Sequence, residues 1–167
     1  MAKYFYAGGE RHELALVDGK LAVDTRGAFE AGVGDAIQSV AASSRLPGGL
    51  TIVDRDTLNA DVHAQLESAR LLHPVYSSGR ALVVLLPEVR VEFDANQEAA
   101  TMNAVRTSPV EAEITGSTAE RLSLRPRSGR GGDALDLANY IYENAHPAAS
   151  SVRMLQVVPK PALNKSR

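Results

Sequence analysis

Four histidines are the side chains of this chain best suited to bind a metal or to move a proton near neutral pH. They are His12, His63, His73 and His146, and no two of them have the HExxH spacing that places two imidazoles on one face of a helix. The chain has no cysteine, so it has no thiolate ligand and no disulfide. We therefore expect each histidine at the surface or at a helix end, and we expect no metal or other cofactor.

A second candidate for chemistry is the glycine-rich loop SGRGG, which begins at Ser128 and precedes a predicted helix. Free amide hydrogens at a helix start can bind an anion. However, the loop lacks the lysine and serine of a phosphate-binding Walker motif, and the adjacent Asp133 would repel phosphate. We interpret the loop as a flexible connection. Because no His, carboxylate and Cys set converges elsewhere, we expect that the protein is not an enzyme.

Composition argues against two classes of partner. A net charge of −2 offers no broad attraction for nucleic acid or anionic lipid, and three Phe with no Trp leave few rings on which bases could stack. No segment approaches the roughly 20 apolar residues of a membrane span, and the start lacks the apolar run of a signal peptide. We expect neither nucleic acid nor a membrane as partner. A cytoplasmic location is favoured for the chain as given, although a cysteine-free sequence also fits many exported bacterial proteins.

The last predicted helix and strand organise the second half of the chain. Asp133 can cap a helix in which Leu135, Ala138 and Ile141 recur at three-residue steps, which places one apolar stripe toward a core. Residues 151–158 then read as a strand, and Pro159 and the proline two residues later prevent its extension as a regular ladder. A strand that leaves its sheet as an extended tail is suited to bind a partner.

The first half begins with a predicted hairpin of residues 4–6 and 12–17 around a glycine turn. Asp18-Gly19 predicts a further turn. The elements expected after it are a strand at residues 20–24, a helix at 28–44, a strand at 50–54 and a helix at 57–72.

The second half repeats this order at an offset of about 70 residues. Corresponding elements begin at Lys20 and Val89, at Ala28 and Asn96, and at Leu50 and Arg121. Each half reads strand, helix, one or two strands, helix, strand, although the first half shows no clear second strand. This order folds readily as a split βαβ, ferredoxin-like unit with both helices on one face of an antiparallel sheet. We therefore expect an α+β fold of two tandem units, with a leading unit at residues 1–80, a second unit at 81–159 and a tail at 160–167.

The chain resembles the N-terminal propeptides of bacterial subtilisin-like serine proteases, of the kind with a leading domain before the propeptide proper. The resemblance rests on KYFYAGGERHEL from Lys3 with KLAV from Lys20, on VRVEF from Val89, and on DALDLAN from Asp133 running into residues 152–159. It covers nearly the whole chain and is carried by apolar spacing. The family often has an acidic and aromatic cluster where this chain has RML from Arg153.

The resemblance implies a mode of binding. Family propeptides lay the open face of a four-stranded sheet on two surface helices of the protease, and their C-terminal tail occupies the active-site cleft as an added strand. They act as folding chaperones and inhibitors. In this chain the tail would be Gln156, Val157, Val158, Pro159, Lys160, Pro161, Ala162 and Leu163. The sheet face would include Arg90, Glu92, Glu111, Glu113, Glu120, Ser123 and Arg125. Of these, Glu111, Glu113 and Glu120 would approach positive helix N-termini, as acidic residues do in the family.

The partner implied by the resemblance is a subtilisin-like serine protease, either the chain's own catalytic domain in cis or a separate enzyme in trans. The sequence contexts that carry the catalytic Asp, His and Ser of subtilisins do not occur here. Two plainer interpretations stay open: the tail could be a frayed terminus and the charged strand face merely solvated. A ferredoxin-like interaction or dimerisation module, indifferent to loss of the tail, is the alternative function.

Overall fold

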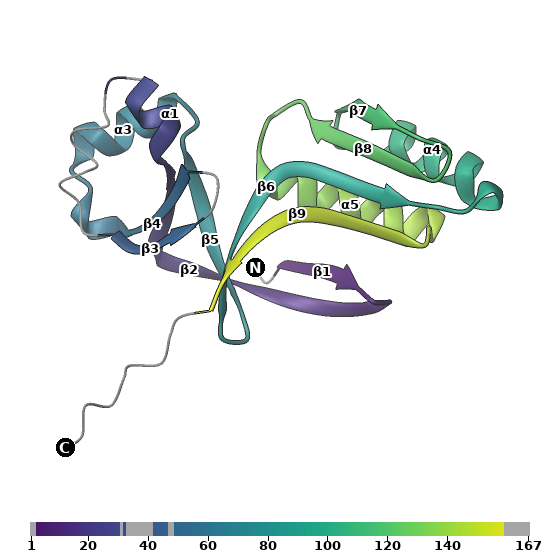
Figure 1. Cartoon of the computed structure of the whole chain (residues 1–167), viewed down its shortest axis with the longest axis horizontal. Helices are drawn as coiled ribbons and strands as arrows, with labels where there is room; N and C mark the ends of the chain where they lie inside the picture. The colour runs from purple at the N-terminus through teal and green to yellow at the C-terminus, as the bar shows by residue number, and fades with distance from the viewer. Residues whose placement is uncertain (1–2, 31, 33–41, 47–48, 159–167) are drawn as a thin grey trace, which may run out of the picture. The chain divides into compact units, whose positions relative to one another are not determined.

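The computed structural model describes residues 3–30, 32, 42–46 and 49–158, and the chain divides into two compact units. Unit 1 comprises Met1–Leu16 with Val84–Leu155, and unit 2 comprises Val17–Val83 with Gln156–Arg167. The described residues form nine strands and four α-helices, and the strands pair antiparallel, so the fold is mixed α and β and compatible with the predicted α+β class (Figure 1). Three strands, β2 (Glu10–Asp24), β6 (Ala81–Glu92) and β9 (Ala149–Val157), contribute residues to both units.

Unit 2 contains the second part of β2 followed by five elements. These are α1 (Thr25–Glu30), β3 (Ala42–Leu46), β4 (Leu50–Asp54), α3 (Ala60–Ser68) and β5 (Leu72–Ser78), with a short 3-10 turn at Arg55–Thr57. Its strands lie in the order β3-β4-β2-β5. Asn59 caps α3, because its side-chain oxygen accepts a hydrogen bond of 2.8 Å from the Val62 amide.

The central strands of unit 2 are buried on both faces. Leu21 of β2 lies opposite Val53 of β4, and both belong to the apolar core that Leu66 of α3 completes. Successive side chains of a strand point to opposite faces. Ala22 and its partner Ile52 therefore point the other way, and both are also fully buried, at 0% exposed.

Unit 1 combines a leading hairpin with a second set of strands and helices. The hairpin joins β1 (Lys3–Ala7) to the first part of β2. The other elements are β6, a 3-10 turn at Ala95–Gln97, α4 (Glu98–Thr107), β7 (Ala112–Ser117), β8 (Arg121–Pro126), α5 (Gly131–Ala145) and β9 (Ala149–Val157). Their strand order is β9-β6-β8-β7. With the hairpin left out, the first strand of each unit, β2 or β6, thus lies between the third and the fourth.

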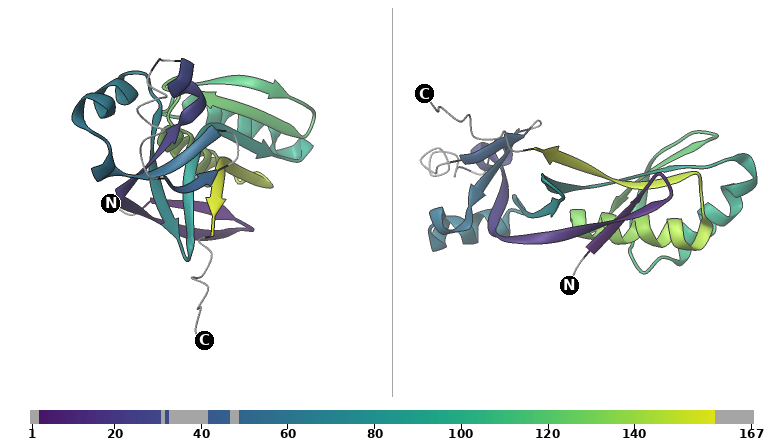
Figure 2. Two further views of the ribbon diagram at one scale, coloured as in Figure 1. Left: turned by 60° about the vertical axis from the view of Figure 1, so that its left-hand side comes forward. Right: turned by 90° about the horizontal axis from the view of Figure 1, so that it is seen from below.

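The helix α5 supplies the core face of unit 1. Leu135, Ala138 and Ile141 are buried, as their spacing predicts. The buried hydroxyl of Ser150 in β9 donates a 2.8 Å hydrogen bond to the Ala138 carbonyl, which fixes this strand to the helix. Figures 1 and 2 show α5 running along one face of β6, β8 and β9.

The close approach of α5 to the sheet requires glycine at its first residue. A Cβ at Gly131 would collide with the backbone carbonyl of Leu85 in β6. Because the helix already begins here, the prediction that Asp133 caps it is wrong: Arg130, in an extended conformation, is the N-cap residue. Asp133 lies in the first turn instead, where its negative charge still favours the positive helix end.

Two predictions for the first half are also corrected. Asp18-Gly19 does not turn the chain, because the residues before it pair with β1 and those after it pair with β4, so β2 stays extended throughout. The structure has the helix α1 at Thr25–Glu30, where the sequence predicts a helix over residues 28–44. Residues 31 and 33–41 of the predicted helix lie outside the described residues, and residues 42–44 belong to the strand β3. Backbone pairing with β4 overrides the helical pattern there, and β3 is the second strand that the sequence did not reveal.

The units also differ from the predicted division at residues 80 and 81. The change from one unit to the other falls at Val83 and Val84 in β6, but the leading hairpin belongs with the second half of the chain and not with the first. The contacts of β1 with α5 are the reason, since they link the two ends of unit 1.

Candidate protein-binding surface

One face of the sheet in unit 1 carries charged side chains and is not covered by α4 or α5. Along β6, Val89 and Val91 are fully buried, whereas Arg90 between them is exposed. The same alternation holds along β8 and β9, as expected of strands with a core on one side only. We call the outward residues the open face: Glu88, Arg90 and Glu92 of β6, Glu113 of β7, Arg121, Ser123 and Arg125 of β8, and Ser151 and Arg153 of β9.

The register of the strands joins these residues into one band. Three cross-strand pairs define it: Arg90 with Ser123, Glu92 with Arg121, and Glu113 with Arg125. Side chains directly opposite each other in antiparallel strands lie about 4.5–5.5 Å apart at Cβ, so neighbouring charges influence each other. The open face is therefore a continuous, mostly charged surface over adjacent strands.

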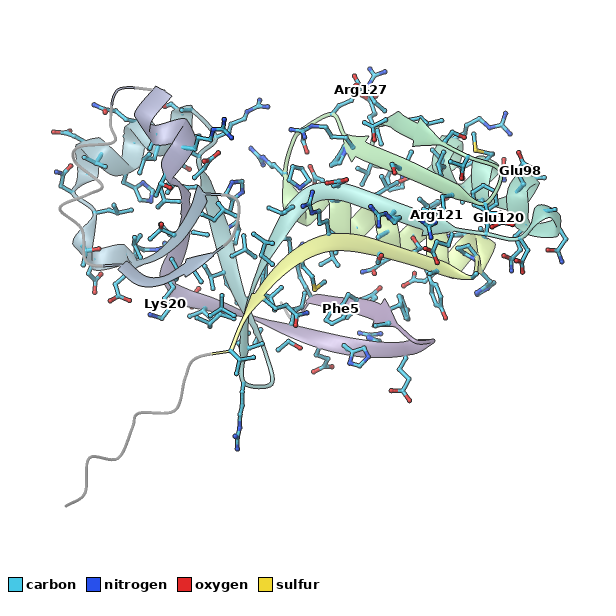
Figure 3. The ribbon with its side chains drawn as sticks, in the orientation of Figure 1. Phe5, Lys20, Glu98, Glu120, Arg121 and Arg127 are labelled. Carbon is cyan, nitrogen blue, oxygen red and sulfur yellow. The ribbon has the colours of Figure 1, made fainter. Side chains whose placement is uncertain are left out.

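Three ion pairs organise the charges of this surface and its rim. Arg153 donates a 3.0 Å hydrogen bond to Glu88, and the Arg121 side chain lies 3.5 Å from Glu92. At the other end of β8, Arg127 lies 3.9 Å from Glu111 (Figure 3). Between 40% and 81% of each of these side chains is exposed. Exposed pairs of this kind contribute about 0–1 kcal/mol to stability, so they shape the charge pattern more than they stabilise the fold.

Five of the seven sheet-face residues named from the sequence lie on the open face: Arg90, Glu92, Glu113, Ser123 and Arg125. The other two do not. Glu111 directly precedes β7, at the rim, where its carbonyl also accepts a hydrogen bond from the Arg127 amide. Glu120 lies in the turn between β7 and β8, where its carbonyl accepts from the Phe93 amide (Figure 3).

The sequence interpretation missed three charged members of the open face. They are Glu88 and Arg153, which pair with each other, and Arg121, which pairs with Glu92. Alternation could have identified Glu88, since it shares parity with Arg90 and Glu92 on the same strand. Arg153 could not be placed without the pairing of β9 with β6.

The described part of the predicted tail is mostly strand. Gln156 and Val157 are the last residues of β9, and Val158 after them is 65% exposed. The predicted tail residues Pro159, Lys160, Pro161, Ala162 and Leu163 lie outside the described residues. The structure therefore gives the start of the tail and its connection to β9.

No protein-family model matches this chain, and no curated protein matches it. The comparisons thus add no family assignment to the resemblance stated above. Among the described residues, no helix is long and apolar enough to cross a membrane.

The histidines do not come together in the described structure. His12 stacks on Phe5, with ring centroids 5.1 Å apart, His63 lies 3.6 Å from Glu67 on α3, and His146 caps the end of α5 in a left-handed conformation. Burial lowers the pKa of His73 in β5, and the nearby Asp24 offsets part of that effect. No group of three or more His, Asp and Glu side chains within the described ranges could hold a metal.

A second polar cluster attaches the leading hairpin to α5. The hydroxyls of Tyr4 and Tyr6 both donate to one carboxylate oxygen of Glu143, at 2.8 and 3.0 Å. Tyr6 also stacks on Tyr142, with ring centroids 4.3 Å apart, and the Asn139 amide donates to the Tyr4 carbonyl. The hydrogen bond to Glu143 is the main cause that raises the pKa of Tyr4. The pKa of Tyr6 is raised mainly by desolvation and, to a smaller extent, by its hydrogen bond to Glu143. Both hydroxyls thus stay protonated and hold the hairpin on the helix.

Proposed function

We propose that this protein is a propeptide-like inhibitor and folding chaperone of a subtilisin-like serine protease, acting in cis or in trans, and that it is not itself an enzyme. We further propose that each unit is a ferredoxin-like, split βαβ unit. The element order and the strand order of both units support this fold assignment, because in each the first strand lies between the third and the fourth.

The observation that carries the functional proposal is the open face of unit 1. Its helices cover one side of the sheet and leave a charged band on the other. Unit 2 offers no equivalent at its central strands, where Ala22 and Ile52 are buried on the second face as well. Family propeptides bind their protease through a sheet face that is left uncovered in this way.

The area of the open face is smaller than that of a standard protein interface, which supports a role for the tail in binding together with the face. Six residues of four neighbouring strands span roughly 20 Å by 20 Å, from a rise of about 3.3 Å per residue and a strand spacing of about 4.8 Å. This footprint is about half of the ~800 Å² that each partner contributes to a standard interface. A tail that continues from β9 and pairs its backbone in a cleft would supply the remainder, and Val158 at its start is exposed and available.

Deletion of residues 158–167 tests this assignment. We expect the truncated protein to lose inhibition of subtilisin-family proteases in a peptide-substrate assay, while its thermal unfolding stays close to that of the full chain. A control with residues 158–167 replaced by a Gly/Ser segment of equal length should lose inhibition to the same extent. Unchanged inhibition constants would contradict the role of the tail.

The same samples distinguish the alternative function. If the full chain inhibits no protease but sedimentation shows a dimer that persists in the truncated protein, the open face joins two copies. The interaction-module interpretation would then replace the protease inhibitor.

A further inference from the structure

On the open face, most glutamate side chains have an ion-pair partner, whereas two arginine side chains have none among the described residues. Glu88 and Glu92 each have an arginine partner on the face, and Glu111 has one at its rim. By contrast, the side chains of Arg90 and Arg125 make no hydrogen bond or ion pair with any residue that the structure describes. Only Glu113, directly opposite Arg125 in the ladder, is an acidic member of the face without such a pair. The positive charges of Arg90 and Arg125 are thus available to a partner, whereas the negative charges of Glu88 and Glu92 are neutralised by arginine.

The two unpaired arginines lie next to each other. Arg90 is opposite Ser123, and Arg125 lies two residues further along the same strand as Ser123. Diagonal neighbours of this kind are about 7–8 Å apart. Like charges carried by neighbouring positions repel each other, and two carboxylates of a partner would relieve that repulsion.

The side chains around this arginine pair are small. Ser123 carries only a hydroxymethyl group, and Gly116 of β7, its cross-strand partner, carries no side chain. A Cβ at Gly116 would already touch Ser123, at 3.7 Å, so the two residues form a low area in the band. A partner can therefore bring carboxylates down beside the guanidinium groups, whose planar forks suit bidentate contact.

We propose that the open face docks on an acidic protein surface that places carboxylates against Arg90 and Arg125. This inference rests on the proposed function and names the chemistry of the protease surface. It reverses the polarity expected from the sequence, in which Glu111, Glu113 and Glu120 approach positive helix ends. Glu111 is engaged by Arg127, Glu120 lies in a turn, and Glu113 is opposite Arg125. An arginine that loses water on docking must gain an acceptor, because otherwise its desolvation opposes binding.

Charge reversal of the two arginines tests the proposal. The probe is a subtilisin-family protease inactivated at its catalytic serine, and affinity is measured by calorimetry or surface plasmon resonance. We expect R90E/R125E to bind at least tenfold more weakly than the wild type, and the affinity of the wild type to fall as salt rises. The matched control is R106E, which reverses an exposed charge on α4, on the other side of the sheet. Circular dichroism checks that all variants are folded.

The outcomes separate this inference from the proposed function. If the wild type binds the protease and R90E/R125E binds as well as R106E does, the acidic docking surface is wrong while the inhibitor proposal stands. If the wild type binds no protease, the proposed function fails. A second probe then tests whether the open face binds carboxylates. A poly-L-glutamate peptide should then shift the guanidinium NMR signals of Arg90 and Arg125 before those of Arg106. Equal or absent shifts would overturn the inference.

Discussion

Units 1 and 2 share a strand order but differ in how the faces of their sheets are covered. In unit 2 the central strands run LAV and LTIV, and their side chains are buried on both faces. In unit 1 the corresponding strands read VRVE and RLSL, in which buried residues alternate with exposed or half-buried ones. The same topology thus supports a strand buried on both faces in one unit and a one-sided sheet with an open face in the other.

The helices of the two units differ as well. The helix α5 of unit 1 has 15 residues with seven of them buried, whereas α3 of unit 2 has nine residues with one buried. In addition, the hairpin packs on α5 through Tyr4, Tyr6 and Glu143, so this helix is held from two sides. This difference is the reason why we propose binding for unit 1: its helices are packed against one face of the sheet, and the other face is open.

The largest predicted effect comes from a charge in the core of unit 1. Ile141 is fully buried, and I141D would place an unpaired carboxylate there, at a cost of several kcal/mol, which is comparable to the total stability of a domain. We expect rapid hydrogen exchange across residues 84–155. N144D, which adds the same group on the exposed side of α5, serves as the control. L66D should have the corresponding effect on residues 17–83, and native exchange in both core variants would show that these helix faces are assigned wrongly.

A smaller effect is expected from the contact between α5 and β6. G131A would press a methyl group against the Leu85 carbonyl and should destabilise unit 1 by about 1–3 kcal/mol, the usual cost of overpacking. The adjacent G132A has only the end of the Lys3 side chain nearby, at 3.8 Å, and should be neutral or slightly stabilising because alanine favours a helix. Chemical denaturation gives both values. Equal midpoints for the two variants would mean that α5 does not approach the sheet this closely.

The smallest predicted effect is a pH dependence in unit 2. Burial lowers the pKa of His73 in the folded state below its unfolded value of about 6.5. The unfolded chain therefore binds more protons as the pH falls through that value, so stability is full above it and declines below it. We expect H73Q to flatten the decrease in melting temperature between pH 7.5 and 5.5. Identical slopes for wild type and variant would exclude this role of His73.

The sequence was most informative where one residue pattern had one structural solution. The apolar stripe of Leu135, Ala138 and Ile141 gave the core face of α5, and alternation around Val89 and Val91 gave the inner and outer sides of β6. The alternation was enough to place Arg90 and Glu92 on the open face. Both patterns act locally, within one helix or one strand.

The features that depend on distant pairing could not be predicted. Asp18-Gly19 has the composition of a turn, yet it lies within β2 because β1 and β4 pair on either side of it. Residues 42–44 end the predicted helix, but pairing with β4 makes them part of the strand β3. The ion pair of Arg153 with Glu88 depends on the pairing of β9 with β6, and the attachment of the hairpin to Glu143 links residues 137 and 139 positions apart. No local pattern contains this information.

The most direct test of the central claim, that the protein blocks the cleft of a serine protease with its tail, is capture from lysate and medium of the source cells. The full chain and the chain lacking residues 158–167 serve as bait, and retained proteins are labelled with an active-site serine-hydrolase probe. We expect both baits to retain a subtilisin-sized protease, which reacts with the probe only when the tail is absent. If neither bait retains a serine hydrolase, the claim is contradicted and the open face serves another partner.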